Sequence, residues 1–198
     1  NASLGTYIGT HDATDVPTQF IESKIDAVSG RLMVCAAGNA GSEDPFHLGY
    51  EAQGDTHFTW LELPQNANPG YSFGFELFGD SNEFERVQFS IGADRVSPFY
   101  SFRGETMFDS VLNRMNFVYT DSLISPSGNF LCEVKTYAYI VNDVYRLQIL
   151  LDNIDSTEFN YRLTIAGFGG FDTWAAQWLG YGDMVSQGLP STTEYQAI

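Results

Sequence analysis

Residues 129–152, NFLCEVKTYAYIVNDVYRLQILLD, hold the pattern that decides the fold of this chain. Two segments of it, 129–140 and 144–151, alternate between side chains suited to a core and side chains suited to water. A period of two is typical of a β-strand with one buried face. The residues between the segments, Val141, Asn142 and Asp143, are of the kind that forms tight turns. This stretch therefore predicts a β-hairpin.

Similar short segments recur along the chain from residue 57 onward. They cover residues 57–63, 71–79, 86–92, 115–124 and 161–169. Turn-forming runs such as NPG, DSN, SPSGN and DNID separate them. Strands at this spacing are typical of two packed antiparallel sheets. We therefore predict a mostly β fold, an antiparallel β-sandwich of jelly-roll type, over residues 44–188.

The aromatic residues, mainly 16 Phe and 11 Tyr, divide into two groups. The first falls at alternating strand positions, which favours packing between the sheets: Trp60, Phe73, Phe75, Phe89, Phe117 and Tyr137. The second group is a candidate adhesive surface, because its two tryptophans lie four residues apart among glycines: Tyr100, Phe102, Trp174, Trp178 and Tyr181.

The first 43 residues follow a different pattern. Pro17 suits the first turn of a helix, with Asp15 or Val16 as its N-cap, and the pair at 29–30, Ser-Gly, ends it. Residues 32–36 are then consecutively apolar, as in a parallel-type strand covered on both faces. With a strand end at residues 2–4, this predicts a short α/β fragment that precedes the β region.

Charge and composition exclude several classes of function. Nine Lys and Arg against 25 Asp and Glu give a net charge of −16, which argues against a nucleic-acid partner. No apolar run approaches the ~20 residues that span a bilayer, so we expect no membrane span. Cys35 and Cys132 lie in separate strand-like segments, and a disulfide between them is not expected. No spacing matches a calcium loop, and we assign no metal ligand and no cofactor.

One amide stands out in the first part of the chain. Asn39 follows the predicted strand 32–36 directly and is surrounded by small residues, in the order Ala36-Ala37-Gly38-Asn39-Ala40-Gly41. Functional groups of parallel sheets lie just beyond the carboxyl ends of the strands. A carboxamide offers two uncharged N–H donors, which suit a developing oxyanion. The alternative is that Asn39 merely caps a turn after a buried strand.

The same residues carry a resemblance to a known family. Ser3-Leu4-Gly5, a helix of suitable length, an apolar strand and then Ala36-Ala37-Gly38-Asn39 resemble the central stretch of subtilisin-like serine proteases, the subtilases. The resemblance implies that residues 3–5 form one wall of the substrate cleft and residues 36–38 the opposite wall. It also implies that Asn39 donates its side-chain amide to the tetrahedral intermediate, and that the substrate is a polypeptide.

The resemblance covers residues 1–43 and leaves the catalytic triad out. The family's Asp, His and Gly-Thr-Ser motifs are absent here, so the chain by itself should be inactive. The chain begins with Asn1, which predicts a piece of a longer protein. Residues 44–188 then look like an insertion into the protease domain, with residues 189–198 returning toward the core. Such insertions resemble those of secreted Bacteroidetes-type subtilases, which implies an extracellular or cell-envelope location.

If the subtilase resemblance does not hold, the alternative is a carbohydrate- or protein-binding β-sandwich module without catalysis. The apolar strand 32–36 also lacks neighbours within this chain, because it belongs to a sheet that the chain does not complete. We therefore expect this strand, or the helix before it, to pack on the β-sandwich or on a second copy of the chain.

Overall fold

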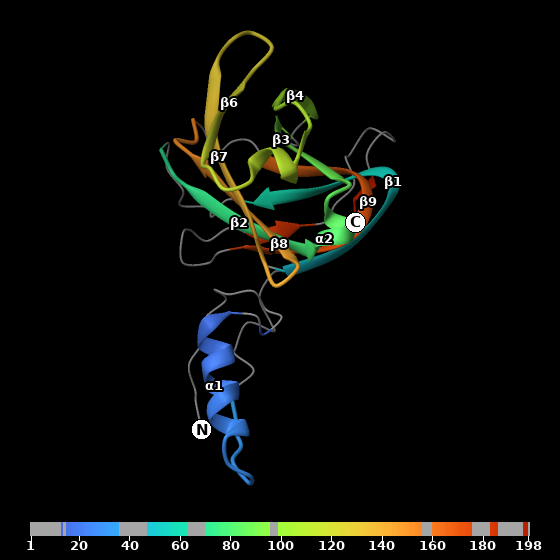
Figure 1. The fold of residues 1–198 in the computed structure, drawn as a ribbon. Coiled ribbons are helices and arrows are strands. Elements are labelled where there is room, and N and C mark those ends of the chain that lie inside the picture. The colour runs from blue at the N-terminus through green and yellow to red at the C-terminus, as the bar shows by residue number, and fades with distance from the viewer. Residues whose placement is uncertain are drawn as a thin grey trace. The chain divides into compact units, whose positions relative to one another are not determined.

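The computed structural model describes residues 13, 15–35, 47–62, 70–95, 99–155, 160–175, 183–185 and 196–197. The chain separates into two compact units, residues 1–43 and 44–198 (Figure 1). In its described residues the first unit holds one helix, and the second is built from strands. No helix in the described part of the chain is long and apolar enough to cross a membrane.

The helix of the first unit, α1 (Val16–Asp26), forms where the sequence predicts it. Asp15 is its N-cap, and the carboxylate accepts a hydrogen bond of 3.0 Å from the backbone N–H of Thr18. Pro17 lies in the first turn, where the missing N–H costs nothing. Gly30, at φ +85°, turns the chain beyond the C-terminus of the helix. None of the side chains of α1 is buried.

The predicted buried strand over residues 32–36 is not found in the residues described there. Residues 31–34 have no regular secondary structure, and Cys35 forms only an isolated β-bridge. Leu32 is 75% exposed, and Met33 and Val34 are exposed as well. A parallel-type strand is stable only between neighbouring strands and under covering helices, and the described residues of this unit contain no strand that could pair with it.

The hairpin predicted from residues 129–152 is confirmed. Strands β7 (Phe130–Val141) and β8 (Val144–Asp152) pair from Val141 opposite Val144 to Glu133 opposite Asp152. The two turn residues, Asn142 and Asp143, have φ of 50° and 65°. A turn with both central residues at positive φ matches the twist of the strands, and Asn and Asp tolerate it best after glycine.

The other strands join this hairpin into one sheet, antiparallel except for one short parallel pair. Its order is β10-β1-β9-β2-β8-β7-β6, with β3 paired to β9 and both β4 and β5 paired to β3, while β11 runs parallel to β1. The bounds are β1 (His47–Glu62), β2 (Phe73–Asp80), β3 (Val87–Arg95), β4 (Ser101–Glu105), β5 (Asp109–Ser110), β6 (Tyr119–Ile124), β9 (Asn160–Ala175), β10 (Asp183–Val185) and β11 (Gln196–Ala197). Two short helical turns, α2 (Ser81–Phe84) and η2 (Val111–Arg114), connect strands.

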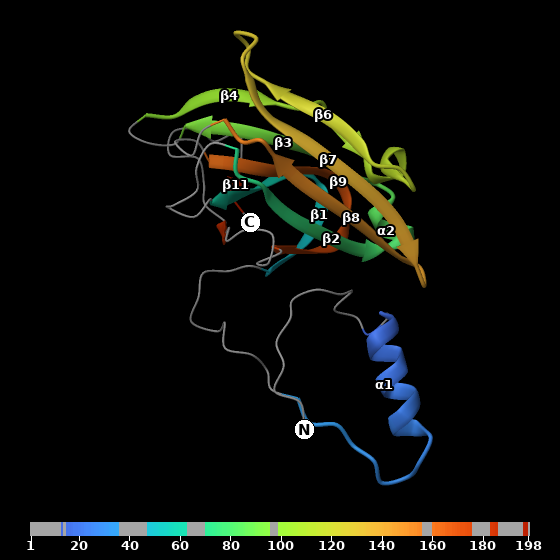
Figure 2. The ribbon, with the colours of Figure 1, turned by 90° about the vertical axis from the view of Figure 1, so that its left-hand side faces the viewer.

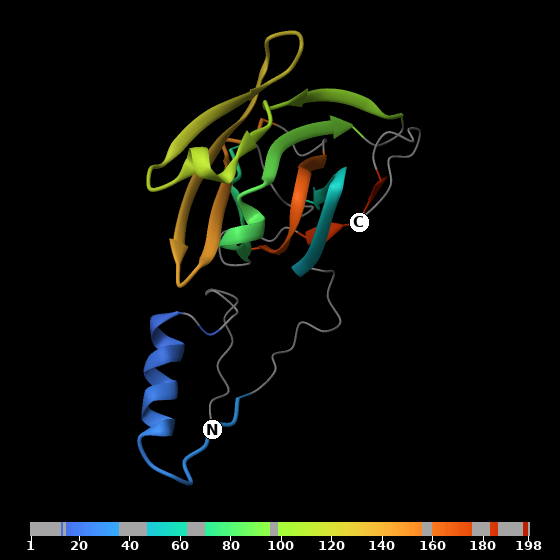
Figure 3. The same cartoon turned by 45° about the vertical axis from the view of Figure 1, so that its right-hand side comes forward.

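The long strand β9 is shared between two parts of the sheet. Its first half pairs with β3 and its second half with β2, while β1 pairs with both halves on the other side. Gly167 and Gly169, at φ +104° and +139°, lie where β9 passes from one partner to the other. The sheet as a whole is strongly curled and nearly barrel-shaped (Figures 2 and 3).

The prediction of a mostly β, antiparallel fold is confirmed, and its finer form differs. The described strands make one curled sheet instead of the two packed sheets of a sandwich. Strand spacing along a sequence does not distinguish the two forms, because both use short antiparallel strands with one buried face. The difference comes from β9, whose glycines let one strand belong to both sides of the fold.

A single apolar core fills the inside of the curled sheet. It takes every second residue of β8 and most of the alternate residues of β7, as the hairpin pattern requires. Of the aromatics predicted to pack inside, Phe73, Phe75 and Phe89 belong to this core. Trp60 is buried outside it, against Phe58 on the other face of β1. Phe117, predicted to join them, is 69% exposed because it precedes β6 instead of lying inside a strand.

Candidate functional site

The site residues predicted from the subtilase resemblance lie outside the described residues. These are Ser3, Leu4, Gly5, Ala36, Ala37, Gly38 and Asn39. The structure therefore neither brings them together nor separates them. The described residue nearest to them in sequence, Cys35, is exposed and carries a free thiol. The candidate site that the structure itself offers is in the second unit.

This site is the outer face of strands β2, β8 and β7. The strand register places its side chains in three rows across the sheet. The rows consist of Phe78, Arg146 and Tyr139, then Glu76, Gln148 and Tyr137, then Gly74, Leu150 and Lys135. Aromatic, aliphatic and charged groups thus share a face that is mainly polar in most sheets facing water.

Glu76 organises the polar part of this face. Its carboxylate accepts a hydrogen bond of 3.0 Å from Nε of Arg146 and another of 2.7 Å from Nε2 of Gln148. The guanidinium of Arg146 also lies 5.2 Å from the ring centre of Phe78 and 5.5 Å from that of Tyr139. A planar cation held by a carboxylate and by two rings has little freedom to move. The face is therefore preorganised.

Burial and charge affect the ionisable groups beside it. Burial is the largest cause that raises the pKa of Tyr139 above its usual value, so this phenol stays a hydrogen-bond donor at neutral pH. Lys135 lies 2.5 Å from the carboxylate of Asp152, and this contact lowers the pKa of Asp152 and raises that of Lys135. Both groups are thus ionised at neutral pH.

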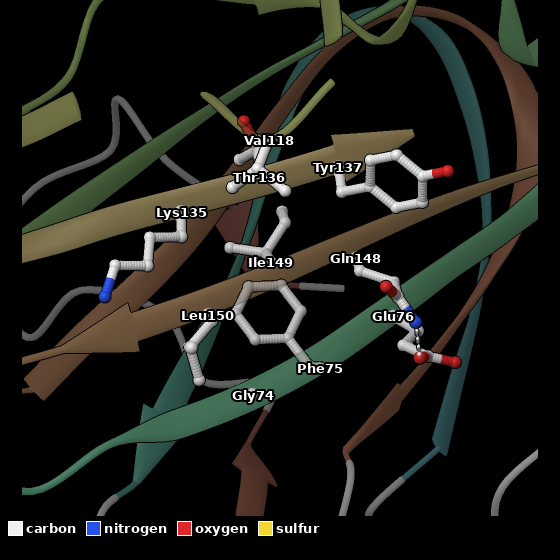
Figure 4. Close-up of a pocket in the computed structure, with 10 residues that line it drawn as sticks. All are labelled: Gly74, Phe75, Glu76, Val118, Lys135, Thr136, Tyr137, Gln148, Ile149 and Leu150. Atoms are coloured by element: carbon white, nitrogen blue, oxygen red, sulfur yellow. Dashed lines mark hydrogen bonds between the residues drawn. The ribbon is translucent and has the colours of Figure 1, made fainter. Parts of the chain in front are cut away.

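A shallow hollow of about 260 Å³ lies on this face (Figure 4). Gly74 contributes no side chain to the hollow. Phe75, Ile149 and Thr136 also line the hollow, and they form the row of the sheet between the row of Glu76 and the row of Gly74. Its surroundings are completed by Glu76, Val118, Lys135, Tyr137, Gln148 and Leu150. A mostly apolar hollow with a few fixed polar groups suits a small ligand that has one apolar face and several hydroxyl groups.

Tyr137 is the residue of this site that sequence reasoning places wrongly. The alternation of aromatics predicts it in the core, but it is half-buried on the outer face, with its ring centre 5.3 Å from that of Tyr139. The hairpin pattern contains the signal that corrects this. Val134 and Ala138 are the small apolar residues of β7, so position 137 must share the other face with Lys135.

The described members of the second predicted aromatic group are not gathered on one surface. Trp174 lies opposite Glu76 across the β9–β2 ladder, whereas Phe102 lies opposite Asp94 across the β3–β4 ladder. Tyr100 donates a hydrogen bond of 3.2 Å to the carboxylate of Asp94. Trp178 and Tyr181 lie outside the described residues. Within the described part of the group, only Trp174 is in a row that reaches the hollow.

A buried cluster of charges lies elsewhere in the sheet. Nε of Arg162 donates a hydrogen bond of 2.6 Å to Asp94, and Nη1 donates one of 3.3 Å to Glu105. Arg162 is 1% exposed and Asp94 is fully buried. Gly92 makes room for this arginine, since a side chain there would clash with the guanidinium. Because solvent does not reach Arg162 or Asp94, we assign this cluster to the architecture of the sheet.

The described residues contain no group of three His, Cys, Asp or Glu side chains that could hold a metal ion. Comparison with protein-family models, with curated proteins and with solved structures finds no match for the chain.

Proposed function

We propose that this chain is part of a secreted subtilisin-like serine endopeptidase, located outside the cell or in its envelope. The observation that carries the proposal is the pair of motifs Ser3-Leu4-Gly5 and Ala36-Ala37-Gly38-Asn39, held apart by a helix of the length that the family uses. The presence of α1 between them, capped by Asp15, supports this order of elements. The β unit that follows is then an accessory domain inserted into the protease.

In this proposal Asn39 acts on charge that forms during the reaction. Attack on the peptide carbonyl moves negative charge onto its oxygen, and the Asn39 amide donates a hydrogen bond to that oxygen. Residues 3–5 and 36–38 hold the extended substrate on either side. The substrate is a polypeptide. The catalytic Ser, His and Asp that act together with Asn39 come from other parts of the full-length protein.

The test is steady-state kinetics of the full-length protein carrying Asn39→Ala. Since the donor serves the transition state and not the bound substrate, kcat should fall while KM stays nearly unchanged. Thermal unfolding should be unaffected. A large rise in KM at constant kcat would instead make Asn39 a substrate-binding group, and a marked loss of Tm would make it a turn cap.

The isolated 198-residue chain should not hydrolyse peptides or peptide esters. One oxyanion donor without nucleophile and base is an incomplete catalytic set. The measurement is hydrolysis of a chromogenic peptide ester by pure chain, with and without a serine-directed inhibitor. Hydrolysis that the inhibitor abolishes would refute this expectation.

The hollow beside Tyr137 favours a second candidate, a carbohydrate-binding module. A sugar ring has an apolar face that can lie against Tyr137 and Leu150, and hydroxyls that can bond to Gln148 and Glu76. Binding of oligomers of glucose, xylose and N-acetylglucosamine can be followed by titration calorimetry. Tyr137→Ala should abolish it, whereas Tyr119→Ala, a surface tyrosine outside the hollow, should not. Failure to bind any of them, or equal loss in both variants, would reject this candidate.

A further inference from the structure

A groove of about 560 Å³ lies between β6 and the segment that runs from the last residue of β4 to the start of β5, beside the point where the nearly closed sheet fails to join. At one end β4 and β6 almost touch, since a side chain at Gly104 would clash with the carbonyl oxygen of Ile124. From that point the groove continues past Met107 and Asp109 on one side and Ser122 and Asp121 on the other. The two views in Figures 1 and 2 show β4 and β6 close to each other.

The edges of this groove are open to strand pairing. In the described part of the sheet, β4 has β3 as its strand partner and β6 has β7, each on one side only. Every second residue of such an edge directs its N–H and C=O away from the partner strand. An extended polypeptide can use these groups, which is the general mode of strand addition to a sheet.

Charge inside the groove is unbalanced. Three carboxylates line it, those of Glu105, Asp109 and Asp121. Glu105 is paired with the buried Arg162, whereas Asp109 and Asp121 share the single guanidinium of Arg114. Nη2 of Arg114 lies 2.7 Å from Asp109 and 2.8 Å from Asp121, so it links the two sides. Arg114 is mostly buried, whereas the side chain of Asp121 is 44% exposed. The groove therefore presents an accessible carboxylate and an excess of negative charge.

Apolar side chains lie beside these carboxylates. Met107 is 90% exposed, and Phe108 and Ile124 are also exposed. All three line the groove. Lys and Arg have apolar stems beneath their charged groups, and a carboxylate next to exposed apolar side chains matches both parts at once.

We propose that this groove binds an extended polypeptide segment that carries lysine or arginine side chains. The segment pairs with the edge strand β6, its cationic groups contact Asp121 and Asp109, and its stems contact Ile124 and Phe108. The charge of the chain decides between possible occupants. At a net charge of −16, a second copy would be repelled, whereas a basic partner is attracted. The proposal is independent of the protease assignment.

Fluorescence anisotropy of a labelled peptide of alternating lysine and valine, titrated with the 198-residue chain, tests this directly. We expect binding at about 0.05 M salt that weakens about tenfold or more at about 0.5 M, where charges are screened over a few ångströms. The same peptide with glutamate in place of lysine has the same length and valine content. It should not bind.

Three variants separate groove binding from general attraction to an acidic protein. Asp121→Lys should lower the affinity about tenfold or more. Glu51→Lys makes the same change of charge at an exposed position of β1 outside the groove, and it should have a much smaller effect. Met107→Ser alters a side chain too exposed to matter for folding, and it should weaken binding several-fold with an unchanged Tm. Equal losses in Asp121→Lys and Glu51→Lys, no effect of Met107→Ser, or no binding of the lysine peptide would each overturn the proposal.

Discussion

Single residues show how this fold tolerates charge in its interior. Asp94 and Arg162 are both buried, and burial of a carboxylate is unfavourable unless the attraction of its partner offsets it. Here burial is the larger effect, because the pKa of Asp94 is raised to about 6 from an ordinary value of 3.8 although Arg162 acts to lower it. The folded state therefore holds a proton on Asp94 to a higher pH than the unfolded state does.

Asp94→Asn should change how stability depends on pH. Between about pH 4 and pH 6 the folded state holds a proton on Asp94 that the unfolded state has released, so stability from this group is lost as pH rises. The unfolding free energy of the variant, relative to the wild type, should thus rise by up to about 3 kcal/mol from pH 4 to pH 7.

Urea unfolding at several pH values measures this difference. Asp143→Asn, in the exposed β7–β8 turn, controls for the loss of one carboxyl group from the chain. A constant difference between wild type and Asp94→Asn across this range would contradict the raised pKa.

The two cysteines should differ in reactivity with a thiol reagent. Both are free, with Cys35 exposed and Cys132 fully buried. Burial raises the pKa of Cys132 to about 12, so almost no reactive thiolate forms at neutral pH. Labelling of the native chain should therefore modify Cys35 quickly and Cys132 only after unfolding. Mass spectrometry of tryptic peptides identifies the site, and rapid labelling of Cys132 would show that the core opens readily.

At the level of elements, β9 connects the parts of the sheet. It has more strand partners than the hairpin strands do, and its passage from β3 to β2 depends on residues without side chains. Gly167 has a positive φ, and a Cβ there would clash with the carbonyl oxygen of Arg86. Both features require glycine. Any other residue would be strained at this φ, and its Cβ would not fit beside the carbonyl oxygen.

Gly167→Ala should consequently destabilise the β unit by more than about 2 kcal/mol, because strain and clash add. Gly128 offers a matched control, since its φ is +86° but a Cβ added there would meet no other atom within 4 Å. Gly128→Ala should cost about 1 kcal/mol, the strain alone. The difference is measured as the shift in the denaturation midpoint. Equal losses in the two variants would show that the contact with Arg86 is easily relieved.

At the scale of the whole molecule, the two units differ in how much structure they contain. The β unit has one continuous core, whereas the helix of the first unit buries no side chain in this structure. A helix of 11 residues in isolation is marginal in water, since most helix stability comes from packing. Most of the folding free energy should thus come from residues 44–198.

Deleting the first 43 residues tests this. A protein starting at Asp44 should unfold in a single cooperative transition with nearly the Tm of the full chain, because the core lies entirely within the β unit. Circular dichroism and calorimetry measure the transition. A broad, non-cooperative melt of the shortened protein would show that the first unit is required for the fold.

Structures with local causes could be predicted from neighbouring residues alone. Asp15 and Pro17 fix the start of α1, and the alternation around Asn142 and Asp143 fixes the β7–β8 hairpin, because caps, turns and a period of two act within a few residues. The sequence also supplies Asn39 and its small neighbours, the basis of the proposed function.

The other features depend on contacts between residues far apart in the chain. The fate of residues 32–34 depends on neighbouring strands that a local pattern cannot supply, and so they are exposed. The described strands form a single curled sheet in place of a sandwich, because β9 pairs with β3 along its first half and with β2 along its second half. The hollow beside Tyr137 and the groove beside Asp121 arise where strands distant in sequence meet, and no pattern within one strand contains that register.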